Sequence, residues 1–134
     1  MSVLVVADIV NNELSIDLTG KTVNAVVNNL GEVTILCACE DAVNSSSEAA
    51  KIKGVSKVLK VSNSMFKNGL AEPMSALIVE LSKEYDYIVS AASAFGKNIL
   101  PRVAALIDVM VITDISKIIN TNTFERPIYA GNAL

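Results

Sequence analysis

The sequence predicts an α/β fold of three layers, with a mainly parallel sheet and helices on both of its faces. Short runs of β-branched and aliphatic residues alternate along the chain with longer segments of helical period. Most of these runs are apolar without a break, which is typical of strands buried on both faces. Apolar residues make up 51% of 134 residues, enough for one sizeable core, so we expect a single domain over residues 1–134.

The first half of the chain is expected to hold three strands and two helices. The strands fall at residues 3–7, 33–38 and 55–61, which are rich in Val, Ile and Leu. A turn is expected at residues 11–13, followed by a helix from about Asp17 to Leu30 that Gly31 ends. A short second helix takes its N-terminal caps from residues 44–47 and ends at Gly54.

The second half is expected to continue the alternation. A polar loop at residues 62–69 leads to a helix that Pro73 opens and that runs to about Glu84. A fourth strand at residues 87–92 leads through a polar connection, residues 93–98, to a helix ending near Ile107, with Pro101 early in it. Residues 110–112, 115–119 and 124–130 are strand-like, and the tight turn at 121–123 predicts antiparallel edge strands near the C-terminus.

Composition excludes several classes of function. The net charge is −3 and the lysines are scattered, so no basic cluster exists to bind nucleic acid. Without any His, a Ser-His-Asp or Cys-His nucleophile and the common zinc sites are excluded, and no hydrolase or transferase mechanism follows. Cys37 and Cys39, two positions apart in an apolar run, are interpreted as reduced core thiols.

The expected location is the cytoplasm of a bacterium. The apolar run at residues 3–7 is too short for a signal-peptide core or a membrane span, and no basic residue precedes it. At the other end, the chain stops at Leu134 directly after an extended run, which suggests that a longer protein would continue.

The connection at residues 93–98 is the candidate ligand site, because it follows an expected strand and precedes a helix. Ligands of open α/β sheets bind at the carboxyl ends of the strands, and a helix N-terminus favours an anion. The candidate anion or nucleotide residues are Ser93, Gly96, Lys97 and Asn98. The structural alternative, in which Ser93 and Asn98 cap the helix and Gly96 makes the turn, is favoured because one glycine matches no phosphate-binding motif.

Two carboxylates and one late segment complete the list of candidates. Asp8 and Asp114 fall at expected strand ends, where either could contact a ribose or a partner, although single carboxylates there are more often capping or solvated. Arg and Tyr are common interface anchors, and residues 124–132 contain both. The alternative for this segment is an edge strand on which Pro127 blocks further pairing.

Several blocks of the sequence, in this order and spacing, resemble electron transfer flavoprotein alpha subunits. The blocks are Ala49 to Val55, Gly69 to Pro73, Tyr85 to Ile88, Gly96 to Ala105, Thr113 to Ile115 and Phe124 to Ala133, together with the opening strand. The resemblance spans essentially the whole chain. It implies a Rossmann-like fold of the nucleotide-binding type and identifies the chain as the N-terminal domain of an alpha subunit.

The resemblance also implies a function and a partner. Alpha and beta subunits of this family form a heterodimer that carries electrons from primary dehydrogenases, such as acyl-CoA dehydrogenases, towards the respiratory chain. One FAD lies mainly in the C-terminal domain of the alpha subunit, and AMP lies in the beta subunit. We therefore expect a scaffold that contacts the beta subunit, without cofactor, metal or catalytic residues of its own, and without nucleic-acid or membrane partners.

The beta-subunit contact is placed at Arg102, Arg126, Pro127, Tyr129 and Asn132, on two of the blocks that carry the resemblance. The alternative function is a self-contained domain that binds AMP or ATP through residues 93–98.

Overall fold

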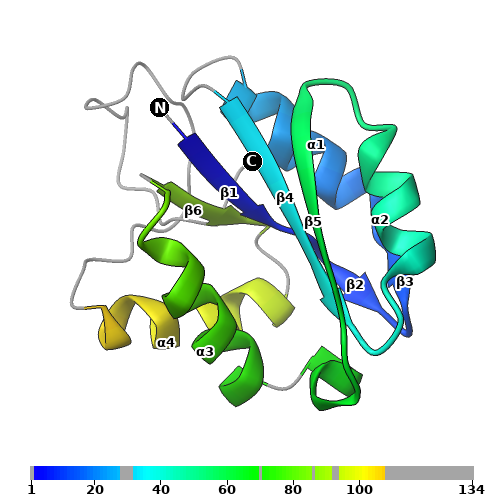
Figure 1. The fold of residues 1–134 in the computed structure, drawn as a ribbon. Helices are drawn as coiled ribbons and strands as arrows, with labels where there is room; N and C mark the ends of the chain where they lie inside the picture. Colours follow the sequence, from blue (N-terminus) through cyan, green and yellow to red (C-terminus); the bar gives the residue numbers. More distant parts are fainter. Residues whose placement is uncertain (1, 28–31, 70, 86, 92–93, 108–134) are drawn as a thin grey trace.

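The computed structural model describes residues 2–27, 32–69, 71–85, 87–91 and 94–107. In chain order these residues form β1 (Ser2–Val6), β2 (Ile9–Val10), β3 (Glu13–Leu14), α1 (Ile16–Val27), β4 (Glu32–Cys39), α2 (Val43–Ala50), β5 (Val55–Ser62), the 3-10 helix η1 (Ser64–Gly69), α3 (Ala71–Ser82), β6 (Tyr87–Ser90) and α4 (Ala94–Leu106). The predicted α/β class is confirmed (Figure 1). The antiparallel edge strands expected near the C-terminus lie outside the described residues.

The main sheet is parallel and has the strand order β5-β4-β1-β6. The chain starts at β1, adds β4 and β5 on one side of it, and then returns to place β6 on the other side. Val5 is paired with Ile35 of β4 and with Val89 of β6, and Ile35 is paired in turn with Val58 of β5, so β1 and β4 lie inside the sheet. The order of the strands therefore reverses between β1 and β6, which is the topological switch point of this sheet.

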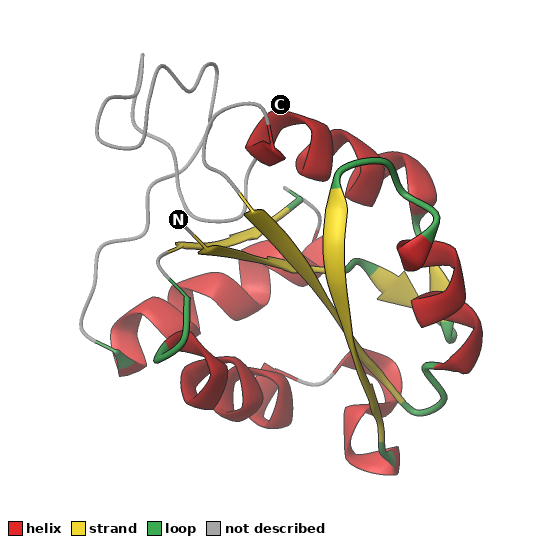
Figure 2. Cartoon of the chain, turned by 45° about the horizontal axis from the view of Figure 1, so that its top comes forward, coloured by secondary structure: helices red, strands yellow, loops and turns green. Residues whose placement is uncertain are grey.

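Helices cover both faces of the sheet (Figure 2). Strand side chains alternate between the faces, so neighbouring residues of β1 belong to different apolar clusters. On one face, Val3 and Val5 pack with Val23 of α1 and Ala49 of α2. On the other, Leu4 and Val6 pack with residues of η1, α3 and α4. Three layers result, as the continuous apolar runs predict.

Helix α2 begins before the residues expected to cap it, so that expectation is wrong. Residues 44–47 lie inside α2. The amide of Val43 instead donates to Asp41 Oδ1 at 3.2 Å, and the amide of Ala42 donates to Ser62 Oγ at 2.9 Å. The hydroxyl of Ser45 is buried and donates to the carbonyl of Ala42 at 3.3 Å. Because Asp41 and Ser62 accept hydrogen bonds from the amides at the start of α2, the helix begins at Val43, before the residues expected to cap it.

The polar segment at residues 62–69 is more ordered than the expected loop, because residues 64–69 form the 3-10 helix η1. The side chain of Asn63 accepts a hydrogen bond from the amide of Met65 at 3.0 Å, and its carbonyl accepts one from Phe66 at 3.1 Å. Phe66 is buried in the cluster beneath α3 and α4. Burial of one aromatic ring therefore gives this segment a defined conformation.

Candidate functional site

The carboxyl edge of the sheet, where β1, β4, β5 and β6 end, is where a ligand of this fold would bind. In sheets that bind dinucleotides, the segment after the first strand is a tight glycine turn whose amides meet the pyrophosphate. Here residues 7–15 contain no glycine and form the hairpin β2–β3 instead. The first loop of this domain therefore lacks the backbone that a pyrophosphate requires.

A two-residue turn closes the β2–β3 hairpin. Asn11 and Asn12 have φ angles of 52° and 64°, in the left-handed region that asparagine tolerates better than most residues. Ile9 pairs with Leu14, and Val10 pairs with Glu13. The sequence predicts a turn here, and the two short strands that flank it are an addition of the structure. The Asn-Asn pair between apolar residues is the signal that could have predicted the hairpin.

Main-chain and side-chain contacts fix the hairpin against the carboxyl edge. The amide of Ser15 donates to the carbonyl of Asp8 at 2.8 Å, which closes the base of the hairpin. The amide of Asp41 donates to Asn12 Oδ1 at 3.1 Å. The hairpin also contacts β4, η1 and α2, and Figure 1 shows it beside the start of α2. It covers the ends of the strands on the β4 side of the switch point.

The sequence candidates at the start of α4 do not form the expected loop. Residues 94–98 belong to the helix, and Pro101 lies inside it rather than early, so this part of the expectation is wrong. The burial of Ile99, Leu100 and Val103 stabilises α4 by more than the helix loses through the backbone hydrogen bond that Pro101 cannot donate. Gly96, Lys97 and Asn98 thus occupy the first two turns of α4, where Asn98 is exposed, and Ser93 lies outside the described residues.

The other candidates are separated in the structure. Asp8 is 5% exposed, follows β1 and serves the hairpin through its carbonyl. Arg102 is exposed on α4. Asp114 and the interface candidates Arg126, Pro127, Tyr129 and Asn132 lie outside the described residues.

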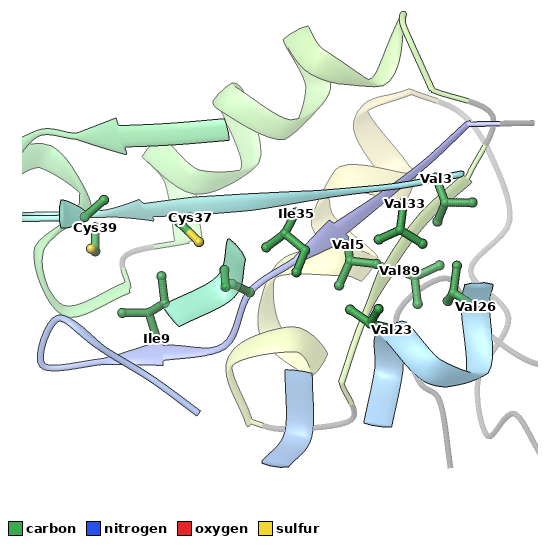
Figure 3. Packing of buried hydrophobic residues seen from close by; sticks show 13 residues of the cluster. Val3, Val5, Ile9, Val23, Val26, Val33, Ile35, Cys37, Cys39 and Val89 are labelled. Carbon is green, nitrogen blue, oxygen red and sulfur yellow. The ribbon is translucent and has the colours of Figure 1, made fainter. Parts of the chain in front are cut away.

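Cys37 and Cys39 are buried free thiols, as their position in an apolar run predicts. Both point to the same face of β4, where Figure 3 shows them beyond Ile35. The Sγ of Cys39 lies 3.8 Å from the Ser45 hydroxyl. Burial raises the pKa of Cys37 to about 12, Cys39 adds to the rise, and the Ser45 hydroxyl partly offsets it. A thiol held neutral in this way is a core residue and a poor nucleophile.

The described residues do not fit FAD. The glycine turn after β1 is missing, as described above. The buried hydroxyls of the described residues that lack a hydrogen-bond partner are those of Thr19 and Ser75. They lie on α1 and α3, which cover opposite faces of the sheet, so the two hydroxyls cannot contact the same ligand. Within the described ranges, no group of three His, Cys, Asp or Glu could hold a metal ion, and no helix is long and apolar enough to cross a bilayer.

These features define a class: a three-layer α/β domain of the Rossmann-like type whose first loop has exchanged its phosphate-binding turn for a hairpin. The family model of the electron transfer flavoprotein domain matches residues 12–134. The chain belongs to the electron transfer flavoprotein family.

Curated relatives place it on the alpha-subunit branch of that family. The electron transfer flavoprotein subunit alpha of Paracoccus denitrificans is 50% identical over all 134 residues, which span 43% of that relative. The subunit alpha of Pseudomonas aeruginosa is 42% identical over the same length, again 43% of the relative. The mitochondrial subunit alpha of Arabidopsis thaliana is 45% identical over 85% of this chain and 34% of its own length. The expected alpha-subunit N-terminal domain is confirmed, and the chain spans less than half the length of these relatives.

Proposed function

We propose that this chain is the scaffold and beta-subunit-contacting domain of an electron transfer flavoprotein. In the complete heterodimer, electrons pass from primary dehydrogenases, such as acyl-CoA dehydrogenases, towards the respiratory chain. The observation that carries the proposal is the 50% identity over the full chain to a protein named as an alpha subunit. The expected location of the protein is the bacterial cytoplasm.

The chain itself contributes structure rather than chemistry in this proposal. FAD is held by other parts of the heterodimer, and AMP by the beta subunit. The hairpin that replaces a glycine turn after β1 supports this division, because a flavin cofactor needs dedicated contacts to its pyrophosphate. We place the first contact with the beta subunit at Arg102, Arg126, Pro127, Tyr129 and Asn132.

Two measurements test the proposal against the alternative of a nucleotide-binding domain. The purified chain should show no flavin absorption in its visible spectrum, and a bound yellow flavin would contradict the division of roles. Calorimetric titration with AMP should give no heat of specific binding. Micromolar binding that Lys97→Ala abolishes would instead favour a nucleotide site at the start of α4.

A further inference from the structure

The large apolar side chains that the structure leaves exposed are concentrated at one end of the molecule. Among the described residues, six such side chains are exposed. Five of them lie on elements that come after a strand of the main sheet, near the carboxyl ends of these strands: Val10, Ile16, Leu18, Val43 and Met65. The sixth, Leu106, lies at the far end of α4. Isolated exposed apolar residues are ordinary on protein surfaces, but their concentration on adjoining elements indicates an interaction surface.

The elements that carry Val10, Met65 and Val43 lie side by side, and Ile16 and Leu18 follow the hairpin directly in sequence. Val10 is on β2, which contacts η1, the element that carries Met65. Strand β3 contacts α2, whose first residue is Val43. The hydrogen bond from the amide of Asp41 to Asn12 ties the hairpin to the start of α2. Figure 1 shows the hairpin next to α2, with η1 at the same end of the sheet. We call this end of the molecule the hairpin surface. It consists of the hairpin at residues 9–15, the start of α1, the residues 40–43 and η1.

The charges on the hairpin surface are mainly acidic. Glu13, Asp17, Glu40 and Asp41 are exposed there. Residues 7–18 and 40–43 contain no lysine or arginine, while Lys60 near the end of β5 and Lys67 on η1 are cations at this end of the sheet. The ion pairs found in the described residues involve other side chains, Glu48 with Lys51 and Glu80 with Lys83. The acidic charges of the hairpin surface are therefore available to a partner.

Helix stability explains only part of this acidity. Asp17 lies in the first turn of α1, and Asp41 accepts a hydrogen bond from the amide of Val43, the first residue of α2, so both interact favourably with helix N-termini. Glu13 on the hairpin and Glu40 between β4 and α2 lie outside the helices. Apolar side chains beside uncompensated acidic ones are complementary to an apolar patch with a rim of Lys and Arg.

We propose that the beta subunit docks on the hairpin surface through an apolar patch surrounded by Lys and Arg side chains. This inference rests on the proposed function, which supplies the partner. The hairpin surface is a second contact, because none of its residues is among the interface residues predicted from the sequence. Those residues are Arg102, Arg126, Pro127, Tyr129 and Asn132. The hairpin that removes a phosphate-binding turn from this domain would thus serve as part of its subunit interface.

The test measures the affinity of the 134-residue chain for the beta subunit by surface-based binding or calorimetry. Val10→Glu and Val43→Glu should each raise the dissociation constant about tenfold or more, because a charge replaces an apolar contact. Ala76→Glu on α3 is the control, since Ala76 is exposed on a helix that carries none of these apolar side chains. It should bind within about twofold of the parent chain.

A second pair of variants tests the charge complementarity. The double substitution Glu13→Lys and Glu40→Lys should weaken binding, and it should reduce the dependence of the affinity on salt concentration. Glu80→Lys on α3, which removes only an exposed ion pair with Lys83, is the control and should change neither quantity. Circular dichroism and thermal unfolding verify that every variant is folded.

The outcomes separate the inference from the proposed function. If the parent chain fails to bind the beta subunit, the proposed function is wrong and the inference with it. If the parent chain binds but folded Val10→Glu and Val43→Glu bind equally well, the hairpin surface is not the interface while the proposed function stands. Loss of binding confined to the hairpin variants, with Ala76→Glu and Glu80→Lys unaffected, supports the inference.

Discussion

The two faces of the four-stranded sheet are both buried but are built from side chains of different size. The face under α1 and α2 is formed mainly by Val, Ala and Cys, and even its helices contribute small residues such as Val23 and Ala49. The face under η1, α3 and α4 is formed by larger side chains, among them Leu36, Phe66 and Met74. The comparison teaches that one sheet can use two packing solutions, one of rigid β-branched residues and one of longer, adaptable residues.

The two solutions should respond to mutation in opposite ways. Removing volume should matter most on the face with large side chains, because the cavity left behind is larger. Adding volume should matter most on the face with small side chains, since Val cannot move aside by changing a second side-chain torsion. The following predictions test this difference, beginning with the largest expected effect.

The largest effect is expected for Leu36→Ala. Leu36 is fully buried on the face under α3 and α4, and it pairs with Val6 and Leu59 of the neighbouring strands. Loss of its isobutyl group should lower the free energy of unfolding by about 3–4 kcal/mol, as measured by urea denaturation. Cys37→Ala, the next residue on the opposite face, is the matched control and should cost clearly less. Equal losses would contradict the comparison.

Overpacking is the second test. Val5→Leu adds one methylene to the face of small residues, between Ile35 and Val89, and should destabilise the protein by about 2 kcal/mol. Val6→Leu makes the same change on the opposite face, where Met74 can adapt, and should cost less than about 1 kcal/mol. The two variants can be compared by thermal unfolding in one experiment. The reverse order would show that the larger side chains are the more rigid ones.

Gly54→Ala should have an intermediate effect at the edge of the small-residue face. Gly54 has a φ of +98°, and a Cβ there would lie 3.2 Å from a methyl group of Val27. Both the strained backbone and the contact oppose a side chain, so we expect a loss of about 1–2 kcal/mol. Gly20→Ala is the control, because a Cβ at Gly20 would meet no atom within 4 Å and alanine favours the helix. A stabilising effect of Gly54→Ala in urea denaturation would contradict this account.

Alkaline pH should reveal the burial of Cys37, with little effect near neutrality. The pKa of this thiol is about 12 in the folded chain against an ordinary value of 9.0, so folding favours its neutral form. The resulting stability is fully present below pH 9 and is lost as the pH rises towards 12. Cys37→Ala should therefore lose less stability over this range than the parent chain, whatever its stability at neutral pH. Parallel stability curves would show that Cys37 is not desolvated.

Much of the fold could be predicted from the sequence, because each central strand is apolar on both faces. The runs around Val5 and Ile35 correspond to β1 and β4 within one or two residues. The stripe of Met74 and Ile78 on α3 is buried as its spacing indicates. Reversal of the strand order at β1 could not be read from the pattern, since periodicity says which residues are buried and not which strands are neighbours.

Element boundaries and the candidate site were harder, since both depend on tertiary contacts. The starts of α2 and α4 are set by Asp41 and by burial of Ile99, which the preference of Ser and Asn for caps does not predict. The candidate residues at 93–98 were selected for a loop that is largely helix. The hairpin surface went unnoticed, because sequence alone does not reveal that Val10 and Met65 stay exposed on adjoining elements.

Hydrogen exchange of the chain with and without the beta subunit tests the central claim most directly. The account predicts slower exchange in the complex at backbone amides of the hairpin, residues 9–15, and of the loop before α2, residues 40–42. Amides in the middle of α3, which carries none of the hairpin-surface side chains, should exchange at unchanged rates. A complex that forms with unchanged exchange throughout residues 9–15 and 40–42 would contradict it.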